Sequence, residues 1–219
     1  MNPSTLFGRL LDDGADDLVV RATDGAVWSM PIGRWLAPAS DVDERVLDRA
    51  TGPVLDVGCG PGRHVHALSR RGVTALGIEL SPTAVRHARD GGAHVVEGSI
   101  FEVAPDPGCW STALLLDGNI GIGGRPQALL CRVAELLCPT GQVLVELDPP
   151  GAATATAEDP GDGTDAFRIR IESDGSTSAW FPWARVTVDS IAEPAAAAGL
   201  TVEDRWTDGD RHFCALRRT

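Results

Sequence analysis

Residues 54–64 read Val-Leu-Asp-Val-Gly-Cys-Gly-Pro-Gly-Arg-His, and this stretch decides the fold. It opens with a short apolar run that is typical of a strand buried on both faces. Three glycines at alternate positions follow, so the chain can turn sharply there and its backbone can approach a ligand closely. A helix that begins near Pro61 or Gly62 points its free N–H groups at the same place. The stretch therefore predicts a strand, a ligand-binding loop and a helix.

The spacing of the glycines and two nearby acids indicate the kind of ligand. A dinucleotide loop has the pattern Gly-x-Gly-x-x-Gly, whereas this chain has Gly-x-Gly-x-Gly, with Arg63 where the last dinucleotide glycine belongs. Asp56 stands two residues before the first glycine, and a carboxylate there suits a cationic ligand better than a pyrophosphate. A second predicted strand, 74–79, ends at Glu79, 21 positions after Gly58. That spacing suits an acid that binds ribose hydroxyls.

The segment Asp-Val-Gly-Cys-Gly-Pro-Gly-Arg closely resembles motif I of the class I S-adenosylmethionine (SAM)-dependent methyltransferases. In that family the loop wraps the cofactor, which carries a sulfonium and an ammonium group and no phosphate. The resemblance implies an α/β, Rossmann-like, doubly wound fold with a mostly parallel seven-stranded sheet, and SAM as the cofactor. The cofactor-binding residues that it implies are Asp56, Gly58, Cys59, Gly60, Gly62, Arg63, Glu79, Leu80, Ser99, Ile100 and Asp117.

Composition excludes several other classes of function. The 219 residues carry 31 acidic and 19 basic side chains, a net charge of −12, which disfavours a nucleic-acid partner. All basic residues are arginine and tyrosine is absent, so a Schiff-base lysine, a P-loop lysine and a tyrosine acid or base are excluded. Five cysteines without a Cys-x-x-Cys pair argue against a disulfide framework. Residues 1–13 lack the apolar run of a signal peptide or membrane anchor, so a cytoplasmic protein is expected.

The chain divides into two predicted parts. Residues 1–50 contain a hairpin, 18–23 and 26–30 around Asp24-Gly25, followed by a helix that starts after Ser40. Residues 51–219 alternate strand and helix, which predicts a parallel sheet covered on both faces. This second part carries an inserted hairpin at about 166–185 and ends in an antiparallel pair of strands. Residues 149–165 are expected to form a loop.

The candidate catalytic residues follow the predicted strand 112–116. Ligands bind at the carboxyl ends of the strands in such sheets, so Asp117 and Asn119 are placed to face the transferable methyl group. Ordinary turn chemistry explains the same two residues equally well. Asn119, Trp183, Arg185 and Trp35 are the candidate substrate ligands; Trp35 equally suits a plug between the hairpin and the core. No metal is expected, because Pro149 follows Asp148 where metal-dependent relatives usually have asparagine.

These observations predict a SAM-dependent methyltransferase that acts on a small polar metabolite, with methylation on oxygen favoured. The motif with which many relatives methylate amino groups is absent after strand 112–116. Three alternatives remain: a nicotinamide-dependent oxidoreductase of the same topology, a SAM-binding protein without catalysis, and metal-dependent methyl transfer with Asp117 and Asp148 as oxygen ligands. No membrane partner is expected.

Overall fold

The computed structural model describes residues 1–15, 17–156, 167–173 and 175–218. A sheet of seven strands forms its centre, in the order β11-β12-β7-β6-β3-β4-β5. The strands are β3 (Val54–Val57), β4 (Ala75–Glu79), β5 (Val95–Glu97), β6 (Trp110–Leu115), β7 (Leu137–Leu147), β11 (Leu200–Asp208) and β12 (Arg211–Arg218). Strands β3 to β7 pair in parallel, and β12 runs antiparallel to both of its neighbours. The predicted fold class is confirmed.

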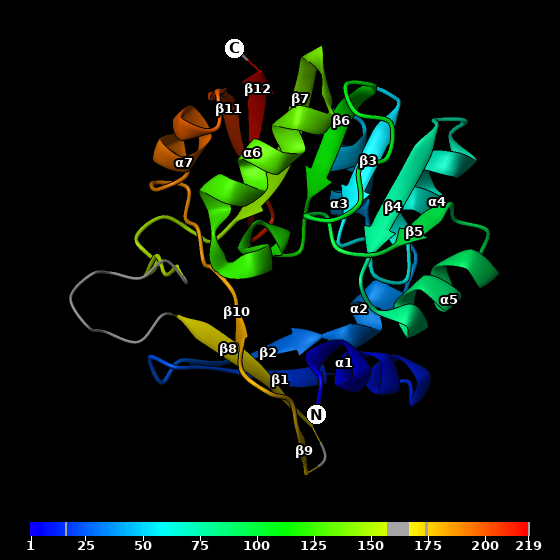
Figure 1. Ribbon diagram of the computed structural model, residues 1–219, viewed down its shortest axis with the longest axis vertical. Helices are drawn as coiled ribbons and strands as arrows, with labels where there is room; N and C mark the ends of the chain where they lie inside the picture. The colour runs from blue at the N-terminus through cyan, green and yellow to red at the C-terminus, as the bar shows by residue number, and fades with distance from the viewer. Residues whose placement is uncertain (16, 157–166, 174, 219) are drawn as a thin grey trace.

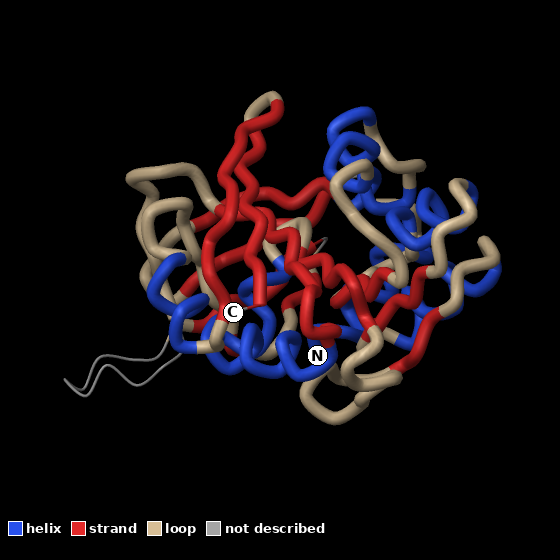
Figure 2. The backbone as a smooth tube through the Cα atoms, turned by 90° about the horizontal axis from the view of Figure 1, so that it is seen from above, coloured by secondary structure: helices blue, strands red, loops and turns tan. Residues whose placement is uncertain are grey.

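Helices cover both faces of this sheet (Figure 2). They are α3 (Asp41–Leu47), α4 (Arg63–Arg70), α5 (Pro82–Asp90), η1 (Asn119–Gly124), α6 (Pro126–Leu136) and α7 (Ala192–Ala197). Apolar side chains of α3, α4 and α5 form the core of one face, and those of α6 and α7 form the core of the other. Strand β3 is buried along its whole length, as expected of a strand covered from both sides.

The two predicted hairpins combine into one small antiparallel sheet, in the order β10-β8-β1-β2. Its strands are β1 (Asp17–Ala22), β2 (Val27–Pro31), β8 (Arg168–Ser173), β9 (Ser176–Thr177) and β10 (Phe181–Pro182). Within the segment predicted as an inserted hairpin, about 166–185, the last strand is only the two-residue β10, where Pro182 lacks a ladder N–H. In Figure 1 this sheet lies below the ends of β4 and β6 toward which the arrows point.

Two short helices belong to the same layer, α1 (Pro3–Asp12) and α2 (Ile32–Leu36). Helix α1 was not predicted, although Asn2 caps it and Pro3 occupies its first turn. The buried leucines of α1 pack with apolar side chains of the small sheet. Gly8 of α1 lies against Thr83 at the start of α5. Part of the predicted loop 149–165 lies outside the described residues. None of the helices that the structure describes has the length and apolar character needed to cross a bilayer.

Candidate functional site

The glycine loop joins β3 to α4 in a conformation that favours glycine. Gly58, Gly60 and Gly62 have φ angles of +73°, +55° and +87°, where a side chain would be strained. The N–H groups of Gly58 and Cys59 donate to the carbonyl of Ile78 at 2.8 and 3.1 Å, which ties the loop to β4. A β-carbon added at Gly60 would meet no atom within 4 Å. The loop therefore leaves open space where a ligand can approach its backbone.

Glu79, at the end of β4, lies directly beside this loop. Its carboxylate accepts hydrogen bonds from the N–H groups of Gly60 at 3.0 Å and Ser81 at 2.7 Å. Burial raises the pKa of Glu79, while the N–H groups of Ser81 and Gly60 oppose that rise. The predicted pair of loop and acid is thus assembled in space. An acid held this way keeps the geometry that two ribose hydroxyls require.

Apolar side chains next to Glu79 remain open to solvent. Leu80 is 59% exposed and Phe101 is 40% exposed, both of them beyond the ends of neighbouring parallel strands. Ser99 accepts a hydrogen bond from the N–H of Phe101 at 3.3 Å. The side chain of Ile100 points into the core, and its carbonyl accepts from the Nε of Arg132 at 3.0 Å. An open glycine loop, a half-buried acid and exposed apolar walls fit the adenosine part of SAM.

Asn119, the first residue of η1 after the neighbouring strand β6, supports the glycine loop. Its amide nitrogen donates to the carbonyl of Val57 at 2.9 Å and to that of Gly58 at 3.0 Å. A β-carbon at Gly58 would lie 2.9 Å from the same nitrogen, so the two segments pack without spare room. The Asn119 amide is therefore turned toward the loop, where it supports the backbone.

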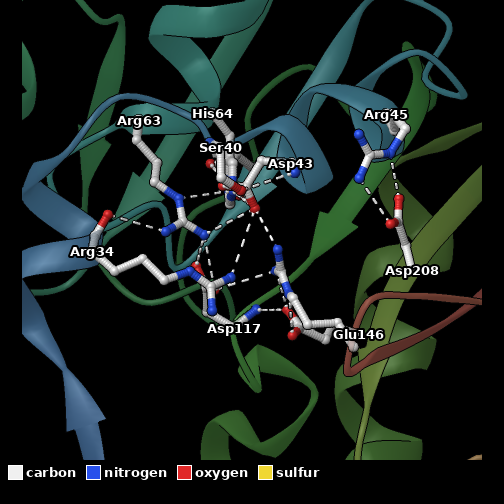
Figure 3. A network of polar contacts seen from close by, with 11 residues as sticks. Arg34, Ser40, Asp43, Arg45, Arg63, His64, Asp117, Glu146 and Asp208 are labelled. Carbon is white, nitrogen blue, oxygen red and sulfur yellow. Dashed lines mark hydrogen bonds and ion pairs between the residues drawn. The ribbon is translucent and has the colours of Figure 1, made fainter.

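A buried network of arginines and acids lies behind the loop (Figure 3). At its centre is Asp43 of α3, which is 1% exposed. Asp43 accepts from Arg211 at 2.6 Å and from Arg63 at 3.3 Å, and Ser40 donates to it through both its N–H and its hydroxyl. Burial alone would raise the pKa of Asp43, but His64, Arg63 and Arg211 hold it well below the usual range.

His64 lies between two buried acids of this network. Its ring nitrogens lie 3.6 Å from Asp43 and 3.5 Å from Asp56. Burial lowers the pKa of His64, but the two carboxylates outweigh it and raise the pKa to about 9, although Arg63 opposes this. Among the described residues, one oxygen of Asp56 is buried with no hydrogen-bond partner. The imidazolium form of His64 compensates part of the negative charge there.

Asp117 and Glu146 complete the network at the ends of β6 and β7. Asp117 accepts from Arg63 through both oxygens, at 2.8 and 2.7 Å, and from Arg34 at 3.2 Å. Glu146 is bound at both oxygens by Arg211, at 2.7 and 2.6 Å, and accepts from the N–H of Asp117 at 2.7 Å. Arg63 was expected at the cofactor; its Nη2 donates to Asp117 and Asp43, and its Nη1 donates to the carbonyl of Arg34.

A cavity of about 400 Å³ opens beside Asp117. Strand β2 contributes Trp28 and Met30 to its wall, and the segment after β10 contributes Trp183 and Arg185. Arg185 donates to Asp148 at 3.0 Å, and its guanidinium lies 5.5 Å from the centre of the Trp28 ring. The cavity therefore lies between the segments in which the candidate substrate ligands were found.

The two candidate tryptophans differ in position, because Trp183 lines the cavity and Trp35 does not. Trp183 packs tightly on η1, since a β-carbon at Gly121 would lie 2.5 Å from its indole nitrogen. Trp35 packs edge to face on Phe7, with ring centres 5.6 Å apart, at the core of the small sheet. That position agrees with the alternative in which Trp35 plugs the hairpin onto the core.

Sequence reasoning missed Asp43, Glu146 and Arg211 as members of the site. Asp43 stands at the third position of α3, where it forms a capping box with Ser40. In the sequence, this capping role is enough to explain an acid at that position. Glu146 and Arg211 lie on β7 and β12, and only strand pairing brings them together. An Arg followed by His just after the glycine loop was the one available signal for a buried cluster.

Comparison with known proteins is consistent with this geometry. A family described as a methyltransferase domain matches residues 54–141. A trans-aconitate 2-methyltransferase of Methylobacterium nodulans is 30% identical over 175 residues, 69% of this chain and 64% of the relative. Another of the same name, from Paracidovorax citrulli, is 30% identical over 114 residues, 50% of this chain and 44% of the relative. The chain thus spans less than two thirds of either relative.

Solved structures share the fold across most of the chain. A SAM-dependent methyltransferase from Bacteroides fragilis, in complex with S-adenosyl-L-homocysteine, superposes with a TM-score of 0.75 at 22% identity, over 98% of this chain and 94% of that one. The SAM-bound amino pentose methyltransferase CalS10 from Micromonospora echinaspora gives 0.57 at 20% identity, over 84% and 92%. At these identities the likeness concerns the fold.

Proposed function

The chain carries a class I SAM-dependent methyltransferase domain, whose cofactor is SAM, and from this premise we propose that it transfers the methyl group of SAM to an oxygen atom of a small polar metabolite. One observation carries the proposal. The cavity of about 400 Å³ begins at Asp117 and Gly118, one residue away from Asn119, which is bonded to the glycine loop. A molecule in this cavity lies next to whatever the loop holds, so proximity supplies much of the rate.

The roles of the residues follow from their contacts. When bound, SAM supplies a methyl group on a sulfonium that leaves as the neutral thioether S-adenosylhomocysteine. Glu79 and the glycine loop hold the adenosine end, Leu80 and Phe101 flank it, and Asn119 keeps the loop in place. Asp117 accepts hydrogen bonds from Arg63 and Arg34 and lies beside the cofactor's charged end. The cavity walls bind and orient the acceptor.

A small acceptor fits the size and lining of the cavity. Cavities of 300–1,000 Å³ are typical of small-molecule sites. The curated relatives are named for trans-aconitate, a small polar metabolite, which supports the same class of acceptor for this chain. We extend the proposal to the N-terminal part, residues 1–50, as a cap, because β2 supplies the cavity with Trp28 and Met30. The net charge of −12 speaks against a nucleic-acid acceptor.

Two experiments test this function. Calorimetry with S-adenosylhomocysteine and with NADH is expected to give binding of the first only; the reverse result would favour an oxidoreductase. A turnover screen for release of S-adenosylhomocysteine against hydroxy, carboxy and amino metabolites then separates an enzyme from a silent SAM-binding protein. A product methylated on nitrogen or carbon would refute the preference for oxygen.

A further inference from the structure

Three acids line the cavity, and they differ in how many of their oxygens are in use. Both oxygens of Asp117 accept from Arg63, and both oxygens of Glu146 accept from Arg211. Asp148 has a single side-chain partner, the Nε of Arg185, which donates to Oδ2 at 3.0 Å. Within the part of the chain that the structure describes, its second oxygen, Oδ1, has no hydrogen-bond partner. Asp148 is therefore the lining acid with a carboxylate oxygen to offer a ligand.

The exposure and the place of Asp148 in the fold also distinguish it from Asp117 and Glu146. The side chain of Asp148 is 30% exposed, compared with 16% for Asp117 and 15% for Glu146. The parallel register Leu115↔Val145 brings the end of β6 level with the end of β7, so Asp148 follows directly beside the Asp117 loop. The N–H of Asp148 donates to Val186 at 2.9 Å, which fixes its backbone at the cavity wall.

The charges of the lining indicate the class of acceptor. Three carboxylates and one guanidinium face the cavity, and further arginines behind Asp117 and Glu146 neutralise these two acids. Among the described residues that line the cavity, an anionic acceptor finds one cation, Arg185, which is already paired with Asp148. A hydroxyl group, in contrast, can donate to a carboxylate oxygen, and the faces of Trp28 and Trp183 suit a flat or apolar body.

We propose that Asp148 accepts the proton of an acceptor hydroxyl, and that the acceptor is a neutral hydroxylated molecule in place of a polycarboxylate. The inference rests on the methyl-transfer function proposed above. The acceptor oxygen forms a bond to the methyl carbon, the bond between that carbon and sulfur breaks with its electron pair left on sulfur, and the hydroxyl proton passes to Oδ1 of Asp148. The proton then leaves to solvent, to which Asp148 is open.

The first arm of the test measures binding with a defined anion. Calorimetry with trans-aconitate in the presence of S-adenosylhomocysteine is expected to show no binding to the wild-type chain. Asp148→Asn removes the negative charge and releases Arg185, so this variant is expected to gain measurable affinity, at least tenfold. Asp189→Asn is the matched control, because Asp189 accepts from the N–H of Gly151 on the adjoining segment. It is expected to behave as wild type.

The second arm measures turnover of neutral hydroxylated probes, namely catechol, inositol and methyl glucoside. For any probe whose methylation releases S-adenosylhomocysteine, Asp148→Asn is expected to lower kcat at least 100-fold. The affinity of this variant for S-adenosylhomocysteine is expected to stay unchanged. Methylation of trans-aconitate by the wild type, or equal kcat in Asp148→Asn, would overturn the proposal. The proposal would also be overturned if Asp148→Asn gained no affinity for trans-aconitate. This binding result decides between the two outcomes if none of the probes reacts. If the wild type did not bind S-adenosylhomocysteine, the proposed methyltransferase function itself would be wrong.

Discussion

One terminal nitrogen of Arg63 lies within hydrogen-bond distance of both carboxylate oxygens of Asp117, at 2.8 and 2.7 Å. Arg63 begins α4 immediately after the glycine loop, and Asp117 follows β6 on the neighbouring strand. The contact therefore ties the helix that follows the glycine loop to the wall of the cavity. Because Arg63 also contacts Asp43 of α3, the same side chain connects the site with the N-terminal part of the chain.

Arg63→Ala is expected to destabilise the protein strongly. The Arg63 side chain is 4% exposed, and its loss leaves Asp43 and Asp117 with fewer cations in a buried setting. Breaking a buried pair by removal of one partner costs about 3–5 kcal/mol. Chemical denaturation measures this difference in the free energy of unfolding.

Arg71→Ala serves as the control for that measurement. Arg71 pairs with Glu44 and Asp48 at the other end of α4, where the partners are more exposed. Exposed pairs contribute about 0–1 kcal/mol, so this variant should remain near wild-type stability. Equal decreases in the free energy of unfolding of the two variants would mean that the buried network stabilises the fold no more than an exposed ion pair does.

Replacing Glu79 is expected to weaken the binding of S-adenosylhomocysteine. Glu79→Ala removes the acceptor of the Gly60 and Ser81 N–H groups as well as the expected partner of the ribose. The loss of a charged hydrogen-bond partner corresponds to about 1–3 kcal/mol, or about 5–150-fold in Kd. Glu97→Ala, at the exposed end of β5, is the matched control. An unchanged Kd in folded Glu79→Ala would place the ribose elsewhere.

Asn119 is expected to act through the glycine loop. Asn119→Ala deletes the two hydrogen bonds to the carbonyls of Val57 and Gly58, and should raise the Kd for S-adenosylhomocysteine by about tenfold. Asn119→Asp should be worse than alanine, because it sets a carboxylate against those two carbonyl oxygens. Calorimetry on both variants checks the order. If aspartate binds as well as the wild type, the amide has no supporting role.

Local sequence signals predicted most of the central sheet. Gly58 and Glu79 are 21 positions apart, and a helix, a turn and a strand fill that interval. The sequence spacing is therefore enough to predict that the loop and the acid lie side by side. The hairpin around Asp24-Gly25 was visible for the same reason. Its pairing with β8, which joins Val19 to Glu172, was not, because no periodicity links strands about 150 residues apart.

The ion network shows the same limit at the level of side chains. Asp43, Glu146 and Arg211 come from different helices and strands, and each of them alone is consistent with a surface charge in the sequence. Arg63 and Asp117 were predicted as site residues, but not as partners of each other. What makes them partners is the sheet order, which places β12 beside β7 and β7 beside β6. Long-range ion pairs of this kind leave no pattern in a single sequence.

The last prediction concerns the pH dependence of stability through His64. Its pKa in the folded state is raised to about 9, from an ordinary value of 6.5. The protonated form is favoured by folding, so its contribution is fully present below pH 6.5 and is lost as the pH rises toward 9. A shift of this size corresponds to at most about 3 kcal/mol. The free energy of unfolding should therefore fall between pH 6.5 and 9.5 in the wild type, and fall less in His64→Gln. Equal slopes in the two proteins would mean that His64 is neutral in the fold and accepts from the Nε of Arg63, 3.1 Å away.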